Sequence, residues 1–201
     1  MERVQIIERV LRCLHEAGVT NVVDPILDYH IDTFLDQAGR EILKVAPIYT
    51  FKGRYATYTQ QNSGLIDNGD GTGSVSLPEN FVRLVAFRME GWQRDVTHLY
   101  TTDDPIYHKQ TNKYLRGGVV NPIMVIEGDR IKYYSLPQGV IHTIQKAEFL
   151  VHIPIELFDD ILIDTLTWLA ASKILDVLNE SEQAEMAHGQ YLQCLNLLKI
   201  C

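Results

Sequence analysis

The chain has 201 residues and a formal net charge of −8, with 46% hydrophobic and 22% charged side chains. This length predicts one domain, or one domain with an insertion, and the composition is that of a globular rather than a disordered protein. The acidic balance argues against a general nucleic-acid binder, which is usually basic. The three cysteines lack CxxC spacing and indicate reduced thiols in a cytosolic setting: Cys13, Cys194 and Cys201.

The first 47 residues predict two amphipathic helices joined by a short link. Apolar residues recur every three or four positions over residues 2–17, and Gly18 is a natural stop because glycine tolerates a positive φ. Asp24 can cap the second helix, Pro25 suits its first position, and Pro47 ends it. We therefore expect an αα-hairpin at the N-terminus.

Between residues 48 and 154 the hydrophobic period changes to two, which predicts strands. Turn signals at residues 67–73 (DNGDGTG) and 127–129 (EGD) separate several of them. One short helix is expected at about 102–114. The expected strands are 51–59, 74–77, 81–89, 96–100, 123–126, 130–136 and 146–153.

Residues 158–179 predict a helix that is apolar on nearly every side. Such a helix must be enclosed by its own domain or by a neighbour. Asp160, Asp164 and Lys173 interrupt it too often for a membrane span. A last amphipathic helix is expected at 181–198, with Asn179 and Glu182 as a capping pair.

These elements predict an α+β fold with a divided helical part. Helical hairpins at the N- and C-termini (residues 1–47 and 155–201) are expected to form one four-helix bundle. The β-rich segment, residues 48–154, is expected to be an insertion with a sandwich or barrel-like form.

Residues 74–96, SVSLPENFVRLVAFRMEGWQRDV, contain a strand that ends in a turn of the form LPxxF/YxR/KL, followed by another strand and a polar step to a tryptophan. Later come a strand that ends at Pro154, a helix of the form DxLxxxxAxxxL and a last helix containing AEMAHGQYLQCLNLL. In these parts and their order the chain resembles the head-to-tail connector (adaptor) proteins of tailed bacteriophages. The most similar type is the tail-tubular or ring connector of short-tailed phages, including crAss-like phages. The motif residues are Leu77, Pro78, Phe81, Arg83 and Leu84.

The resemblance implies a structural virion protein at the head-tail junction, made in the cytoplasm of the bacterial host. It implies that copies form a ring, usually twelvefold, around the DNA channel. The helical part would lie next to the portal protein and the β part toward other tail or ring proteins. DNA would pass through without sequence-specific binding, and neither a membrane nor a cofactor would be involved.

One motif has the spacing of a calcium loop. In residues 68–79, NGDGTGSVSLPE, the positions one, three, five and twelve of an EF-hand are Asn68, Asp70, Thr72 and Glu79. The asparagine at position one, the proline at position eleven and the lack of flanking helices favour a glycine-rich hairpin turn instead. We therefore predict no metal site and keep calcium as the alternative.

Three further segments are candidate interfaces. Lys109, Lys113 and Arg116 would form a basic stripe on the expected short helix, facing an acidic neighbour or DNA, or simply solvent. In residues 51–58, FKGRYATY, aromatic and basic side chains alternate, which favours a partner-facing strand or loop. The apolar side of the 158–179 helix that includes Trp168 and Ile174 is expected to meet a neighbour. In the segment 51–58, the candidate interface residues are Lys52, Arg54 and Tyr55.

No nucleophile elbow, phosphate-binding glycine loop or HExxH motif is present in the sequence. We therefore predict that the protein is not an enzyme and has no catalytic residues. Two alternatives remain beside the connector. One is a soluble, non-viral protein-binding module without catalysis, and the other is a hydrolase or isomerase with an unrecognised site.

Overall fold

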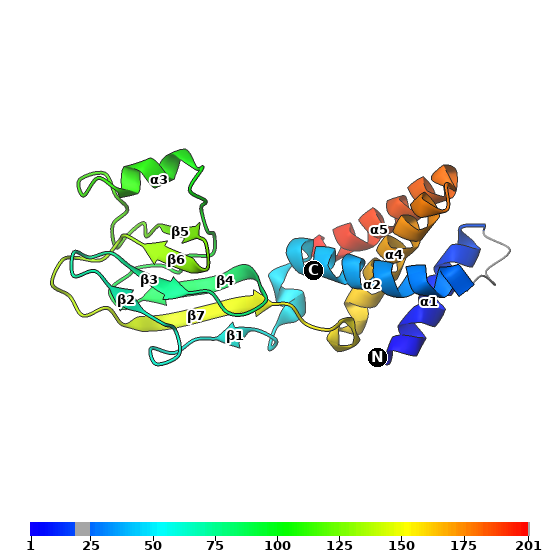
Figure 1. Ribbon diagram of the computed structural model, residues 1–201, viewed down its shortest axis with the longest axis horizontal. Helices are drawn as coiled ribbons and strands as arrows, with labels where there is room; N and C mark the ends of the chain where they lie inside the picture. The colour runs from blue at the N-terminus through cyan, green and yellow to red at the C-terminus, as the bar shows by residue number, and fades with distance from the viewer. Residues whose placement is uncertain (19–24, 201) are drawn as a thin grey trace. The chain divides into compact units, whose positions relative to one another are not determined.

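The computed structural model describes residues 1–18 and 25–200, so the predicted Asp24 cap and Cys201 lie outside the described residues. The chain forms two compact units (Figure 1). The helical unit comprises residues 1–53 and 152–201, and the β unit comprises residues 54–151. None of the described helices is long and apolar enough to cross a membrane.

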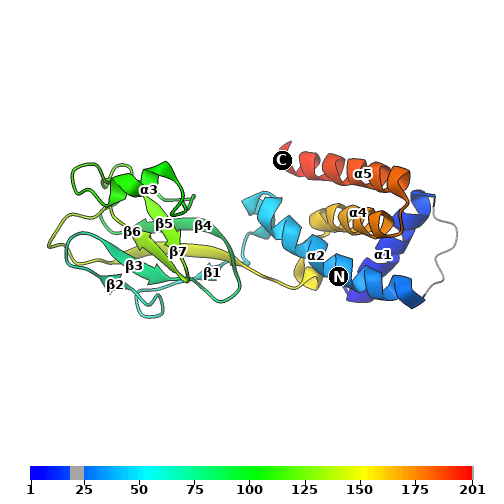
Figure 2. The same ribbon diagram turned by 45° about the horizontal axis from the view of Figure 1, so that its top comes forward.

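The helical unit is organised around α4 (Asp160–Val177), which is buried on most of its circumference. Three helices pack against α4: α1 (Arg3–Glu16), α2 (Pro25–Val45) and α5 (Ser181–Ile200). Figure 2 shows α4 between them. Two 3₁₀ turns, η1 (Ile48–Phe51) and η2 (Ile155–Leu157), lie where the chain leaves and re-enters this unit.

The predicted four-helix bundle built from two terminal hairpins is wrong. The α1 and α2 helices barely touch each other, and each packs on α4 instead. The physical reason lies in the apolar surfaces. Each of α1 and α2 has one apolar stripe, whereas α4 has apolar side chains all round and so can serve three neighbours at once.

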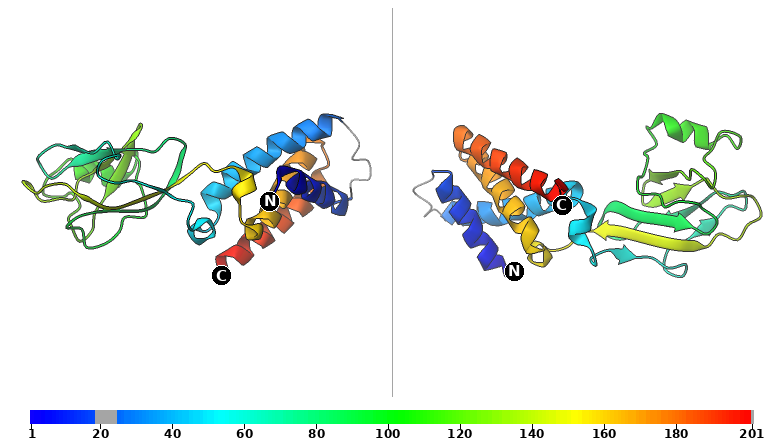
Figure 3. Two further views of the ribbon diagram at one scale, coloured as in Figure 1. Left: turned by 90° about the horizontal axis from the view of Figure 1, so that it is seen from below. Right: turned by 180° about the vertical axis from the view of Figure 1, so that it is seen from behind.

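The β unit consists of two antiparallel sheets. The first has the order β1 (Ala56–Thr57), β7 (Ile144–Val151), β4 (Phe81–Met89). The second has the order β2 (Ile66–Asp67), β3 (Gly73–Ser76), β6 (Arg130–Tyr133), β5 (Met124–Glu127). Figure 3 shows both sheets from two further directions.

Both sheets contribute to one aromatic-rich core. Phe87 of β4 and Phe149 of β7 pack with Trp92, and Trp92 in turn meets Tyr133 of β6 edge-on. Gly73 on β3 is required for this packing, because a Cβ there would lie 2.1 Å from the Tyr133 hydroxyl oxygen. Alternation along the strands places these side chains on the inner faces.

The helix α3 (Pro105–Gln110) is shorter than the helix expected at 102–114. Gln110 is buried, and its side-chain oxygen accepts a hydrogen bond from the Gly117 backbone N–H at 2.9 Å. Tyr114 N–H bonds to the Asn112 side chain at 2.9 Å. Local side-chain bonds of this kind compete with helical ones, so the chain turns after Gln110.

Candidate functional site

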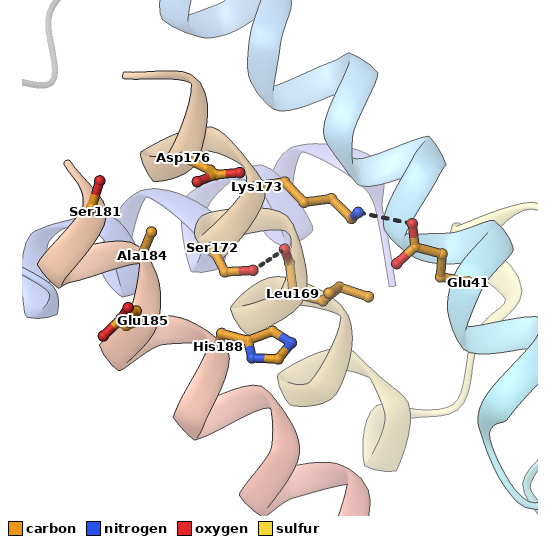
Figure 4. A pocket seen from close by; sticks show the side chains of 9 residues that line it. All are labelled: Glu41, Leu169, Ser172, Lys173, Asp176, Ser181, Ala184, Glu185 and His188. Atoms are coloured by element: carbon orange, nitrogen blue, oxygen red, sulfur yellow. Dashed lines mark hydrogen bonds and ion pairs between the residues drawn. The ribbon is translucent and has the colours of Figure 1, made fainter. Parts of the chain in front are cut away.

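An open groove of about 500 Å³ lies on the helical unit, over α4 (Figure 4). Its lining comes from three helices: α2 gives Glu41, α4 gives Leu169, Ser172, Lys173 and Asp176, and α5 gives Ser181, Ala184, Glu185 and His188. The small side chains of Ser172 and Ala184 leave room between α4 and α5. We refer to this feature as the acidic groove.

Carboxylates outnumber cations in the acidic groove. Lys173 Nζ lies 2.8 Å from Glu41 Oε1, so these two charges largely compensate each other. The carboxylates of Asp176 and Glu185 have no such partner among the groove's lining residues, and both residues are exposed. The Ser172 hydroxyl donates to the Leu169 carbonyl at 2.9 Å, a bond within its own helix rather than one to a general base. The groove is therefore suited to binding a cationic group more than to nucleophilic chemistry.

No metal-binding cluster is found in residues 1–18 and 25–200, where no three His, Cys, Asp or Glu side chains are arranged to hold an ion. The calcium candidates lie on the β2–β3 turn, except Glu79, which lies beyond β3 and is exposed. The Asp70 carboxylate accepts bonds from the hydroxyl and N–H of Thr72, at 2.6 and 3.0 Å, which lower the pKa of Asp70. Asn68 donates to the Thr72 hydroxyl at 2.9 Å. The turn thus uses these groups for its own hydrogen bonds.

The predicted basic residues lie on α3 and the turn after it. Lys109 is in α3, whereas Lys113 and Arg116 follow its end, so they do not form a stripe on one helix. Arg116 Nη2 donates to the Asp70 carbonyl at 2.7 Å, which fixes the end of this stretch. We call residues 108–116 the basic segment. It contains three cations and no carboxylate.

The basic segment also exposes large apolar side chains. Tyr114 is 82% exposed and Leu115 is 63% exposed, and Lys113 Nζ lies 5.0 Å from the centre of the Tyr114 ring. Beside them is a shallow pocket of about 320 Å³ bordered by Lys113, Arg116 and Ser135. An exposed aromatic among cations is typical of a contact surface.

The other predicted interface residues have different surroundings. Lys52 is exposed at the end of η1, and Arg54 and Tyr55 are half-buried just before β1. Burial raises the pKa of Tyr55. On α4, Trp168 is half-buried, whereas Ile174 is fully buried in the helical unit's own core. The sequence alone could not tell that Trp168 is partly exposed and Ile174 is buried, because α4 is apolar on nearly all of its faces.

The outer face of α5 is a candidate surface that hydrophobic periodicity did not predict. Its inward face is the predicted one, with Ala184, Ala187, Tyr191, Leu195 and Leu198 buried. Its outward face exposes large apolar side chains: Met186, Leu192, Leu197 (59% exposed) and Ile200 (82% exposed). Residues 186–198 contain no Asp, Glu, Lys or Arg. This run without charged residues is the sequence feature that could have predicted an apolar surface here. We call this surface the α5 outer face.

A buried polar cluster in the β unit was also not predicted. His142 Nδ1 lies 2.6 Å from the Tyr133 hydroxyl and 3.1 Å from Asp67 Oδ1. Burial raises the pKa of Tyr133, so its hydroxyl stays protonated. Gln60 bonds to the His142 carbonyl at 2.9 Å and to the Ile144 N–H at 2.9 Å. The cluster joins β2, β6 and the approach to β7, which is a structural role.

The net charge is unevenly divided between the two units. The helical unit has 16 acidic and 8 basic side chains, whereas the β unit has 10 of each. The whole formal charge of −8 therefore belongs to the helical unit. A comparison with protein-family models gave no match, and a comparison with curated proteins gave no significant match.

Proposed function

We propose that this protein is a structural virion subunit, a head-to-tail connector that forms a ring around the DNA channel of a tailed phage. It binds other copies of itself, the portal protein on one side and tail or further ring proteins on the other. No catalysis is required. The proposal begins from the motif at Leu77–Leu84 and the order of elements, which resemble connector proteins.

The observation that carries the proposal is the α5 outer face. Most exposed helix faces are rich in charge, but this one combines Met186, Leu192, Leu197 and Ile200 with glutamines and an asparagine. Helix α5 packs mainly on α4, and the Tyr49 hydroxyl of η1 donates a hydrogen bond to its Leu198 carbonyl, while Met186, Leu192, Leu197 and Ile200 stay largely exposed to solvent. Large apolar side chains exposed along a helix with few charges are typical of a protein–protein interface. This face supports an assembly function.

The charge distribution supports a position beside DNA. The helical unit carries the net −8, and phosphate is also negative. Like charges repel, so DNA moving past this unit would not adhere to it. An acidic channel wall is therefore compatible with passage of DNA, whereas a basic one would hold the DNA.

Co-expression with the portal protein of the same genome, followed by purification and negative-stain electron microscopy, tests the proposal. The expected result is a ring of this protein on the portal particle. Leu197→Glu, on the α5 outer face, should reduce the amount bound at least tenfold, because it buries a charge in the interface. Glu182→Lys, exposed in the first turn of α5, is the matched control and should bind normally. Failure of the wild-type protein to co-purify contradicts the connector function.

A further inference from the structure

The acidic groove and the basic segment have complementary chemistry, and they lie on different units of the chain. The groove offers Asp176 and Glu185 above an apolar floor that includes Leu169 and Ala184. The segment offers Lys113 beside the exposed side chains of Tyr114 and Leu115. A groove of about 500 Å³ is large enough for side chains of this size.

We propose that the basic segment of one copy docks into the acidic groove of the next copy, and that this contact builds the ring. The inference rests on the proposed connector function and names the interface that it needs. In this contact the ammonium of Lys113 meets the carboxylates of Asp176 and Glu185. The Tyr114 and Leu115 side chains cover Leu169 and Ala184.

The choice of a second copy as the occupant follows from charge. The helical unit carries the whole net negative charge, and residues 105–126 of the β unit contain three cations and no carboxylate. The two surfaces are different patches, so the contact is heterologous, which is the kind of contact that forms a ring when its repeated rotation closes. Complementary charges would set the register between neighbours and speed their association.

The segment is also held in shape before it binds. Arg116 is bonded to the Asp70 carbonyl at 2.7 Å, and Gln110 is bonded to the Gly117 N–H at 2.9 Å. Less conformational entropy is therefore lost on docking than a free loop would lose. This leaves Lys113, Tyr114 and Leu115 presented between two anchored ends.

Charge reversal in the full-length protein tests the contact. Lys113→Glu and Glu185→Lys should each raise the concentration needed for half-assembly at least about tenfold, because each creates a like-charge pair. Assembly is measured by sedimentation velocity at low salt, and on the co-expressed portal particle. The matched controls are Arg94→Glu in the β unit and Glu8→Lys on α1, both exposed and outside the two surfaces. Circular dichroism confirms that every variant is folded.

Mixing the two single variants gives the decisive readout. A Lys113→Glu copy presents a carboxylate at position 113 and keeps Glu185 in its groove, whereas a Glu185→Lys copy keeps Lys113 and presents an ammonium at position 185. Each variant alone should assemble poorly, but an equimolar mixture should form rings, because every junction between the two variants then pairs residues 113 and 185 of opposite charge. A contact within one chain would be restored by the double variant and not by mixing, and that outcome overturns the proposal.

The test separates this inference from the proposed function. If wild-type rings form and the reversals leave them unchanged, the connector function stands and the groove–segment contact is wrong. If Glu185→Lys weakens only binding to the portal and Lys113→Glu has no effect, the groove binds another protein and the contact is again wrong. If the wild-type protein forms no ring either alone or with the portal, the connector function itself fails.

Discussion

At the scale of single residues, Arg3 has the densest set of polar contacts in the described part of the helical unit. Its guanidinium lies 3.0 Å from Asp32, 3.1 Å from Asp36 and 3.1 Å from Glu156. Burial opposes its charge, but the hydrogen bonds to the three carboxylates outweigh burial and raise the pKa of Arg3. One side chain at the start of α1 thus joins α2 and η2.

Replacing Arg3 with Met should destabilise the helical unit by about 1–2 kcal/mol at pH 7, since each partly exposed ion pair contributes up to about 1 kcal/mol. The difference should also depend on pH. The pKa of Glu156 is lowered from 4.5 by its own backbone hydrogen bond and by Arg3. A lowered pKa stabilises the folded state above the unfolded value, and this stabilisation is lost as pH falls through the folded value.

The gap in stability between wild type and Arg3→Met should therefore be constant above about pH 5.5 and shrink below pH 4.5. Urea unfolding followed by circular dichroism at several pH values measures it. Arg12→Met, an exposed arginine on the same helix, is the control and should change little. An equal loss for both variants would mean that the Arg3 network does not stabilise the fold.

Residue-level polar networks could not be predicted from the sequence. The partners of His142 are Asp67, from β2, and Tyr133, from β6, and no spacing rule connects such distant positions. Arg3 likewise meets Glu156 across 153 positions. Hydrophobic periodicity identifies faces of elements, but long-range polar pairing depends on how those faces meet.

At the scale of elements, two helical glycines have opposite surroundings. A Cβ on Gly39 in α2 would lie 2.5 Å from Ile155 Cγ2, whereas a Cβ on Gly189 in α5 would meet nothing within 4 Å. Gly39 therefore allows α2 to approach η2 closely. At Gly189, by contrast, no close contact requires a glycine.

Gly39→Ala should destabilise the helical unit by about 1–3 kcal/mol, because Ile155 is buried and must move. Gly189→Ala should stabilise it by about 0.5–1 kcal/mol, because alanine is the better helix former and the site is open. Thermal unfolding followed at a helical wavelength compares the two. Stabilisation by both substitutions would show that α2 and η2 are not in close contact.

Elements with a strong hydrophobic periodicity were predicted correctly. The predictions failed where the arrangement depends on which elements pack together. The strand expected at 81–89 is β4, and the inward face expected for the last helix is the buried face of α5. The strand expected at 51–59 is reduced to Ala56–Thr57, because Phe51 ends the 3₁₀ turn η1. The bundle was wrong because an all-round apolar helix does not specify which neighbours it takes.

Of the two surfaces in the proposed contact, the sequence predicts the basic residues but not the acidic groove, because the groove depends on packing. The run of cations from Lys109 to Arg116 is visible in the sequence, but the acidic groove requires Glu41 of α2 beside Asp176 of α4 and Glu185 of α5. Only the packing of both helices on α4 brings these carboxylates to one groove. Composition gave the net charge but not its confinement to one unit.

At the scale of the whole molecule, the proposed ring predicts different roles for two residues of α4, Trp168 and Leu166. Trp168 is half-buried on α4, whereas Leu166, two residues earlier on the same helix, is fully buried. Trp168→Ala should weaken ring formation more than it weakens folding of the monomer. Leu166→Ala should destabilise the monomer itself by about 2–5 kcal/mol, the usual range for a buried leucine.

Sedimentation velocity gives the assembly change and urea unfolding gives the folding change for both variants. If Trp168→Ala reduces both by the same free energy, Trp168 is ordinary core and the neighbour contact predicted for it is absent.

The central position of α4 has a consequence for how the protein opens in solution. Amide protons inside α4 are covered by three helices, so they should exchange with solvent only when the whole helical unit unfolds. Helix α5 packs mainly on α4, with one further hydrogen bond from Tyr49 to Leu198, and can detach as a local opening that leaves α1, α2 and α4 together. Amides of α5 should therefore exchange faster than those of α4 in the free protein, and a partner bound to the α5 outer face should remove that difference.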